Sequence, residues 1–260
     1  MRVALAQMTV VEGDIDRNHG VAREAVAEAI RAGAEVVAFP ELFLTGYDWG
    51  QIRNASPAST RMVERHIRAL AGKITVIGGS FAEARRGGIC NTTIVVKPGG
   101  RRAATYRKMH LFSMLGEDRV FTGGDSTVSF PLGRWRAGLA TCYDLRFPEM
   151  FRRLTYAHRC NVVFVQSSWP MPRQSAWDVL LRARAMEDQL YVCGTNRVGP
   201  GGKLVYFGST QVVSPLGEVL CNKGRTEGLL VADLDLDEVS RVRRLIPALK
   251  ERQPRVYGKY

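Results

Sequence analysis

Short apolar stretches alternate with longer amphipathic ones along the chain, a pattern typical of strands that alternate with helices. The stretches 2–8, 35–40 and 74–81 are short and apolar, so each predicts a buried strand. The longer segments 16–34 and 59–72 repeat apolar residues at helical spacing, so each predicts a helix.

The alternation continues to the end of the chain. Residues 91–108 indicate two strands joined at a Pro-Gly-Gly turn, followed by a polar stretch at 109–126. Further strands are expected at 126–130, 134–142, 161–168, 191–196, 209–220 (two strands and a turn) and 228–234, with helices at 148–159 and 175–189. A short helix and an irregular tail should follow. This order favours an α/β fold with a parallel or mixed sheet covered by helices. With no repeat or linker to divide it, we expect one domain over 1–260.

The charge balance allows several kinds of partner. The 260 residues include 37 Lys and Arg against 25 Asp and Glu, a net charge of +12. Such a balance is found in nucleic-acid binders, in proteins with anionic substrates and on solvated surfaces. Here the arginines are spread over helices that also carry acidic residues, without a basic tail or interleaved aromatic residues. We therefore expect no nucleic-acid partner, and keep nucleic-acid binding as an alternative.

Cysteine and histidine usage argues against several other classes. The five cysteines are scattered and contain no Cys-x-x-Cys, and the four histidines form no ligand pair, so neither disulfides nor a metal site is expected. No apolar run approaches the roughly 20 residues of a membrane span, and the first residues do not resemble a signal peptide. We expect a cytoplasmic protein with no membrane partner.

Three of the expected strands end in a residue capable of chemistry. Glu41, Lys108 and Cys142 each follow an apolar stretch, in "EVVAFPE", "AATYRK" and "GLATC". Binding sites in open α/β sheets form beyond the carboxyl ends of strands, so the three side chains can converge. In isolation, each residue has an ordinary structural explanation: a turn cap, a surface lysine and a core cysteine.

Together, these three groups form a coherent acyl-transfer site. A thiol is mostly protonated at neutral pH, so Glu41 would take the proton of Cys142 as general base and later protonate the departing amine. Lys108 would orient the base and stabilise the oxyanion, with the backbone N–H of Tyr143 as second donor. The strand-to-helix junction at Cys142 should expose the nucleophile and, as a helix start, favour the thiolate.

Three segments carry a resemblance to a known family. "PELFLTGYD", "YRKMHLF" and "TCYDLRFPE", in this order, resemble the signature segments of the nitrilase superfamily of carbon–nitrogen hydrolases. The likeness covers nearly the whole chain. It implies a four-layer α-β-β-α sandwich, a Glu41–Lys108–Cys142 triad, and no metal or organic cofactor. It also implies a second active-site glutamate, Glu117, and a homodimer with the tail 247–260 in its contacts.

The resemblance leaves the substrate open among nitriles, carbamoyl amines and small amides. Residues 167–199 are similar to bacterial ω-amidases that act on 2-oxoglutaramate, which favours an ω-amide of a 2-oxo acid. Such a substrate carries a carboxylate that an arginine can bind through two hydrogen bonds. Arg173 is our first candidate, followed by Arg146 and Arg197. Trp169 should form a wall of the pocket.

Some roles and alternatives stay open at this point. Tyr47 is a further candidate for the pocket wall. Asp144 and Arg146 are expected to pair and shape the turn after Cys142 rather than react. Deaminated glutathione is the nearest alternative substrate. A catalytically silent scaffold is the alternative of a different class, and the intact triad argues against it.

Overall fold

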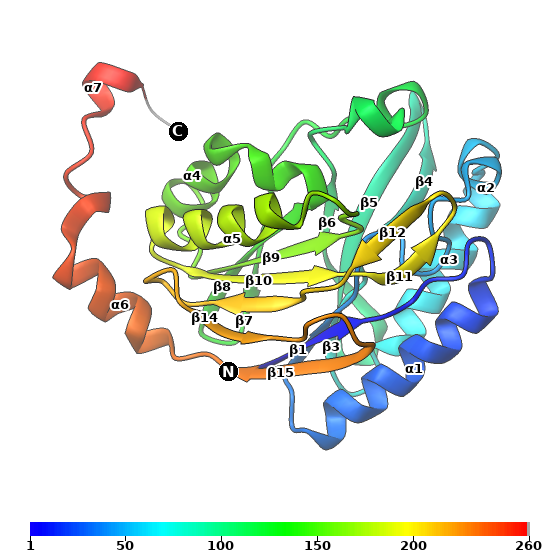
Figure 1. Ribbon diagram of the computed structural model, residues 1–260, viewed down its shortest axis with the longest axis horizontal. Helices are drawn as coiled ribbons and strands as arrows, with labels where there is room; N and C mark the ends of the chain where they lie inside the picture. The colour runs from blue at the N-terminus through cyan, green and yellow to red at the C-terminus, as the bar shows by residue number, and fades with distance from the viewer. Residues whose placement is uncertain (259–260) are drawn as a thin grey trace.

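The computed structural model describes residues 1–258 and contains two β-sheets packed face to face, with helices on both outer sides (Figure 1). Helices α1 (Ile15–Arg31) and α3 (Pro57–Leu70) cover the first sheet, and α4 (Pro148–Tyr156) and α5 (Gln174–Asp188) cover the second. The predicted four-layer α-β-β-α sandwich is therefore confirmed.

The first sheet has seven strands. Six lie in the order β15 (Gly228–Asp233), β1 (Arg2–Gln7), β2 (Val36–Ala38), β3 (Thr75–Ile77), β5 (Gly88–Lys97) and β4 (Phe81–Arg85), and β6 (Arg101–Arg107) also pairs with β5. β1, β2 and β3 are parallel. Because β5 is antiparallel to both β3 and β6, strand β6 runs in the direction of β2.

The second sheet has six strands, in the order β14 (Val219–Asn222), β13 (Gln211–Val213), β10 (Tyr191–Asn196), β9 (Val162–Ser167), β8 (Trp135–Thr141) and β7 (Ser129–Leu132). Its three central strands, β8, β9 and β10, are parallel. Their carboxyl ends therefore lie at one edge of the sheet, where polar side chains can gather.

Side chains of successive residues on β1 enter different cores. Val3 and Leu5 belong to the core that includes the second sheet, whereas Ala4 and Ala6 pack with residues of α1 and α3. This alternation follows from the two-residue period of a strand and explains why β1 is apolar throughout. On the other side, α5 packs so close to β10 that a Cβ on Gly194 would lie 2.7 Å from Leu181.

Most predicted elements are present, and the differences have local causes. Helix α2 (Trp49–Arg53) was not expected, since five residues are too few for a helical pattern. The stretch 74–81 was expected as one strand, but it divides between β3 and β4 at Gly78 and Gly79, the latter with a φ of +44°. The hairpin of β11 (Val198–Gly201) and β12 (Leu204–Phe207) was hidden by a glycine-rich sequence.

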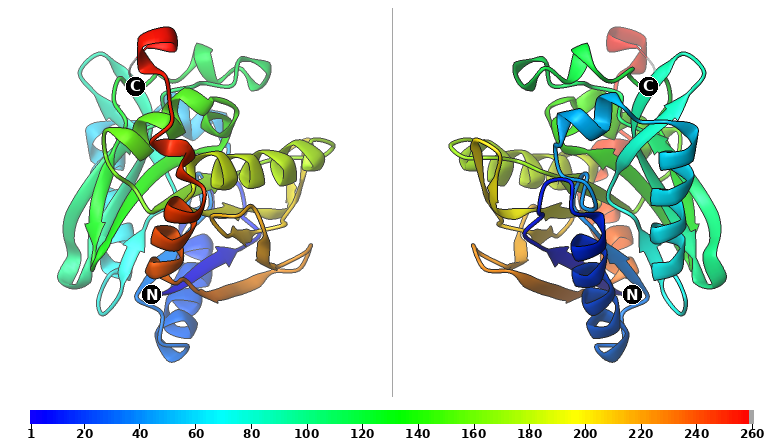
Figure 2. Two further views of the ribbon diagram at one scale, coloured as in Figure 1. Left: turned by 90° about the vertical axis from the view of Figure 1, so that its left-hand side faces the viewer. Right: turned by 90° about the vertical axis from the view of Figure 1, so that its right-hand side faces the viewer.

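The C-terminal segment leaves the sandwich after α6 (Leu236–Leu245), and the short helix α7 (Pro254–Tyr257) stands clear of it (Figures 1 and 2). The Tyr156 hydroxyl donates a 3.3 Å hydrogen bond to the Leu249 carbonyl and fixes the middle of this segment. Residues 259 and 260 of the predicted contact tail lie outside the described residues. Among residues 1–258, no helix is both long and apolar enough to span a membrane.

Candidate active site

The three predicted catalytic residues follow strands from both sheets. Glu41 lies three residues after β2, Lys108 directly follows β6, and Cys142 directly follows β8 of the facing sheet. Glu41 and Lys108 are fully buried, and Cys142 is 8% exposed. The charges of Glu41 and Lys108 both act on the Cys142 thiol. The tertiary structure thus brings together three residues that span about 100 positions of the sequence.

Lys108 is the centre of a buried charge cluster. Its Nζ donates hydrogen bonds of 2.8 Å to Glu41 Oε1 and to Glu117 Oε1, and none of the three side chains is exposed. Burial by itself lowers the Lys108 pKa, but the carboxylates of Glu117 and Glu41 outweigh it and raise the pKa well above its usual value. Lys108 therefore stays an ammonium at neutral pH and can stabilise a developing oxyanion.

Glu41 is held by donors from both sheets. Its Oε1 accepts a 2.9 Å hydrogen bond from Asn91 Nδ2 on β5, and its Oε2 accepts a 3.1 Å hydrogen bond from the backbone N–H of Ser168, after β9. Leu42, the next residue, has a φ of +51°, a strained conformation that turns the chain sharply. Neither Asn91 nor Ser168 was predicted as a site residue; in the sequence each is only a polar residue within, or just after, an apolar strand.

Glu117, predicted from the family resemblance, joins this cluster. Besides Lys108, its carboxylate accepts hydrogen bonds from the Tyr47 hydroxyl (2.7 Å) and the Phe112 backbone N–H (2.8 Å). Burial and the nearby Glu41 raise the Glu117 pKa, while Lys108 opposes them. Burial and the same two carboxylates raise the Tyr47 pKa well above its usual value, so the phenol stays a donor.

Cys142 begins a tight 3-10 turn rather than an α-helix. Its φ is +48°, the turn covers Cys142–Arg146, and α4 begins only at Pro148. Burial, and next the Glu41 carboxylate, raise the pKa of the thiol, although Lys108 opposes them. The resting nucleophile is thus a neutral thiol. The expectation that a helix start favours the thiolate is wrong, and the thiol needs a base.

Asp144 connects the chain around Lys108 to the turn after Cys142. Its buried carboxylate accepts hydrogen bonds from the Tyr106 hydroxyl and from the backbone N–H of His110 (3.1 Å), and it lies 2.8 Å from His110 Nδ1. Tyr106 and His110 are two residues before and two residues after Lys108. Asp144 therefore fixes the segment that carries the ammonium.

The same carboxylate fixes the nucleophile. Asp144 Oδ2 accepts a 2.8 Å hydrogen bond from the backbone N–H of Thr141, directly before Cys142. The expected pair of Asp144 with Arg146 is wrong: Arg146 instead lies over the ring of Trp169, with 5.2 Å from Cζ to the ring centroid. Arg146 is exposed whereas Asp144 is fully buried, so the two side chains extend into different surroundings.

Comparison with known protein families identifies the family to which a chain with this site belongs. The family profile described as carbon-nitrogen hydrolase matches residues 2–244. The chain belongs to this family. It is a hydrolase that acts on non-peptide C–N bonds, and the Glu-Lys-Cys arrangement lies within the matched residues.

Relatives of this hydrolase include amidases over nearly their whole length. The 2-oxoglutaramate amidase of Bacillus subtilis is 32% identical, over 86% of this chain and 87% of that protein. The human omega-amidase NIT2 is 30% identical, over 99% of this chain and 96% of that protein. A solved amidase mutant from Nesterenkonia sp. AN1 carries the acetamide moiety of fluoroacetamide on its active-site cysteine. That structure has a TM-score of 0.89 at 29% identity and covers 99% of this chain and 95% of its own.

A small cavity of the hydrolase adjoins the nucleophile. Its volume is about 10 Å³ and its lining includes Glu117, Cys142, Tyr143, Trp169 and Arg173. The predicted site residues Tyr143, Trp169 and Arg173 therefore meet here. Tyr47, the further candidate for the pocket wall, does not line this cavity but reaches Glu117 through its hydroxyl.

Two arginines border this cavity, and a third is elsewhere. Arg146 also lines the cavity, and the Arg173 guanidinium lies over the Phe112 ring at 5.2 Å from its centroid. Arg197, our third candidate for binding a carboxylate, is wrong for that role. It is fully buried and already pairs with Glu12 at 3.0 Å.

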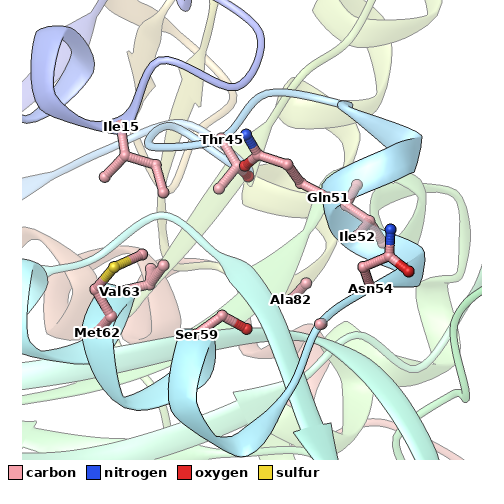
Figure 3. A pocket seen from close by; sticks show the side chains of 10 residues that line it. Ile15, Thr45, Gln51, Ile52, Asn54, Ser59, Met62, Val63 and Ala82 are labelled. Atoms are coloured by element: carbon pink, nitrogen blue, oxygen red, sulfur yellow. The ribbon is translucent and has the colours of Figure 1, made fainter.

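A larger cavity of about 310 Å³ lies between α2, α3 and β4 (Figure 3). It is lined by apolar side chains such as Ile52, Met62 and Val63, with the amides of Gln51 and Asn54 among them. None of the predicted site residues lines it, and its lining contains no Cys, His, Lys, Asp or Glu side chain. Within residues 1–258, no group of three or more His, Cys, Asp or Glu side chains is placed to hold a metal ion.

Proposed function

We propose that this hydrolase cleaves the ω-amide of a small 2-oxo dicarboxylic acid, such as 2-oxoglutaramate, to the acid and ammonia. One observation carries the proposal: the thiol of Cys142 shares its cavity with Glu117, which binds Lys108, and with two arginines that bind no acidic side chain among residues 1–258. Such guanidinium groups are suited to an anionic substrate.

Acylation begins with the neutral thiol. Glu41 accepts the proton of Cys142, and the thiolate attacks the amide carbonyl. The carbonyl oxygen becomes an oxyanion, which accepts hydrogen bonds from Lys108 Nζ and from the backbone N–H of Tyr143. Protonated Glu41 then donates to the amide nitrogen, the C–N bond breaks, and ammonia leaves the thioester.

Deacylation uses the same groups with water as the nucleophile. Glu41 takes a proton from water, the resulting hydroxide adds to the thioester carbonyl, and Lys108 again stabilises the oxyanion. The C–S bond then breaks and Cys142 regains its proton. Glu117 holds Lys108 in place throughout, since its carboxylate accepts a hydrogen bond from the ammonium at 2.8 Å.

The cavity supports a small substrate with a carboxylate. Its volume of about 10 Å³ is at the lower limit for a single water molecule, so the aromatic and arginine side chains around it must move apart when a substrate enters. Arg173 and Arg146 lie on rings and bind no acidic side chain within residues 1–258, so their N–H donors can bind a carboxylate. The likeness to 2-oxoglutaramate amidase and omega-amidase supports the same substrate class.

Product release from a panel of substrates tests the proposal. Ammonia is measured for 2-oxoglutaramate, 2-oxosuccinamate, N-carbamoyl amines and a simple nitrile. For deaminated glutathione the released cysteinylglycine is measured instead, because its amide nitrogen belongs to that dipeptide, and Cys142→Ala is the blank throughout. We expect the two 2-oxo ω-amides to be hydrolysed fastest. Activity only elsewhere in the panel would reject this substrate class and keep the mechanism; inactivity throughout would favour the scaffold alternative.

We also propose that the protein forms a homodimer through its C-terminal tail. Val256 is 81% exposed and Tyr257 is 51% exposed, so this tail presents apolar side chains to solvent. Light scattering of the full chain and of a chain ending at residue 246 tests this. A dimer for both lengths, or a monomer for both, would contradict it.

A further inference from the structure

A second recess lies next to the catalytic cavity. It has a volume of about 420 Å³ and is lined by residues that include Tyr47, Trp49, Leu115, Leu204 and Tyr206. These residues come from the loop after Glu41 and the start of α2, from the 3-10 turn before Glu117, and from β12. The recess is much larger than the cavity at Cys142, and its walls are mainly aromatic and aliphatic.

Two contacts connect the recess to the reacting groups. Leu115 lines both the recess and the cavity at Cys142, so the two spaces share a wall. Tyr47, on the wall of the recess, donates its 2.7 Å hydrogen bond to Glu117, which lines the catalytic cavity. The recess is therefore adjacent to the carboxylate side of the active site.

The geometry of the attacked carbon indicates which part of a substrate faces this side. In the mechanism above, the carbonyl oxygen binds Lys108 and the Tyr143 N–H, and the acyl chain extends toward Arg173. The third substituent is the amide nitrogen, which must face Glu41 because Glu41 protonates it. Glu117 lies on the same side, since both carboxylates accept hydrogen bonds from Lys108 Nζ. A group attached to that nitrogen would extend past Glu117 toward the recess.

We propose that this recess binds the amine half of an N-substituted amide, so that the hydrolase also cleaves secondary amides whose nitrogen carries an apolar or aromatic group. The inference rests on the proposed function, because it uses the same acyl-enzyme. The same site can also form such an amide, when an amine bound in the recess replaces water in the deacylation step. Its nitrogen attacks the thioester, the C–N bond forms, the C–S bond breaks, and the proton lost from nitrogen returns through Glu41 to Cys142.

The charges around the recess favour an uncharged substituent. Glu12 lines it, and the Oε1 atom of this carboxylate pairs with Arg197 at 3.0 Å, whereas its buried Oε2 has no hydrogen-bond partner among residues 1–258 and can accept one from the substituent. Lys203 also lines it and disfavours a cationic group. Trp49 and Tyr47, whose ring centroids are 5.3 Å apart, offer aromatic surface for stacking.

Acyl transfer to two matched amines tests the inference. With 2-oxoglutaramate as donor, the hydroxamate products are measured for hydroxylamine and for O-benzylhydroxylamine, which differ by one aromatic group. We expect the benzyl compound to reach half-maximal transfer at about tenfold lower concentration, as expected for one buried aromatic contact. Leu204→Trp should fill the recess and abolish this preference.

Val205→Trp is the matched control. Val205 is the next residue on β12, is 58% exposed and does not line the recess, because neighbouring residues of a strand face opposite sides. Both variants should release ammonia from the primary amide at the wild-type rate, which also reports correct folding. The preference for the benzyl compound should persist in Val205→Trp.

The outcomes separate this inference from the proposed function. Normal ammonia release without a preference for O-benzylhydroxylamine, or an equal loss of preference in both variants, overturns the inference and leaves the proposed function intact. If 2-oxoglutaramate is not a donor but another amide of the panel gives the benzyl preference, the proposed substrate fails and the inference stands.

Discussion

The two ends of the active site are built differently. At the catalytic end, Glu41, Lys108 and Glu117 are fully buried, and each makes at least two charge-assisted hydrogen bonds. At the substrate end, Arg146 and Arg173 lie on aromatic rings and make no ion pair among residues 1–258. Within the described residues, the hydrogen bonds of the catalytic end are formed without a ligand, whereas the two guanidinium groups of the other end have N–H donors that bind no carboxylate.

This difference suggests that one end of the site serves the chemical step and the other end serves substrate binding. A buried cluster with satisfied hydrogen bonds needs no rearrangement when charge develops, which is the condition for electrostatic stabilisation of a transition state. Under the proposed function, the arginine end gains its anionic partner only when a substrate binds, so we expect it to contribute to binding. Substitutions at the catalytic end should therefore lower kcat, whereas those at the arginine end should raise KM.

Cys142→Ala should give the largest effect. Without the thiol no thioester forms, so we expect turnover to fall by about 10⁴-fold or more, in the range seen when a nucleophile is removed. The protein should stay folded, since a small side chain replaces one at a cavity wall. Ammonia release and a thermal melt measure both. Residual turnover within tenfold of wild type would remove Cys142 from the mechanism.

Lys108→Ala should follow, with a loss of about 10²–10³-fold in kcat or more because an oxyanion donor is removed. Lys108→Arg should recover little of this activity, since a planar guanidinium cannot occupy the point between two carboxylates. Steady-state kinetics of both variants provide the test. A fully active Arg variant would contradict the assigned role.

Asp144→Asn tests whether the catalytic end depends on its connection to the Lys108 segment. An amide has one acceptor oxygen and cannot satisfy all the donors that surround this carboxylate. We expect kcat to fall by about tenfold to 100-fold with little change in KM, as for catalytic groups that are slightly misplaced. A comparable rise in KM alone would place Asp144 in substrate binding instead.

Arg173→Ala tests whether the arginine end of the site binds the substrate carboxylate. We expect KM for a carboxylate-bearing amide to rise by about tenfold, with kcat within a few-fold of wild type, since a charged hydrogen bond is lost only in binding. Arg136→Ala, at an exposed position on β8, is the control and should change neither. The role is rejected if kcat/KM for a neutral primary amide falls equally.

The smallest effect concerns pH. Burial and Glu41 raise the Glu117 pKa, so on acidification this group takes up a proton at a higher pH than an ordinary glutamate, whose pKa is about 4.3. Protonated Glu117 loses its negative charge and binds the Lys108 ammonium more weakly. On acidification, kcat/KM should therefore begin to fall at a pH above the pKa of an ordinary glutamate. In Glu117→Gln this step should disappear from the acid limb of the profile. An unchanged limb would show that Glu117 does not titrate in this range.

Residues could be predicted from the sequence where their own segment indicated the role. Glu41, Lys108 and Cys142 follow apolar strands, and Glu117 matched a family segment; all four gather in one place. It failed where a role depends on distant contacts. Arg197 is indistinguishable from Arg173 by sequence, yet it pairs with a glutamate 185 positions away.

The sequence by itself determined the alternation of elements, the family and the reactive groups, because these depend on residue type, local periodicity and spacing. Only the tertiary structure decided which polar residues complete the site. Asn91 and Ser168 reach Glu41 from separate sheets, and Asp144 connects two loops. Such contacts join positions far apart in the chain, and no local pattern specifies which buried donor meets which acceptor until the two sheets have packed together.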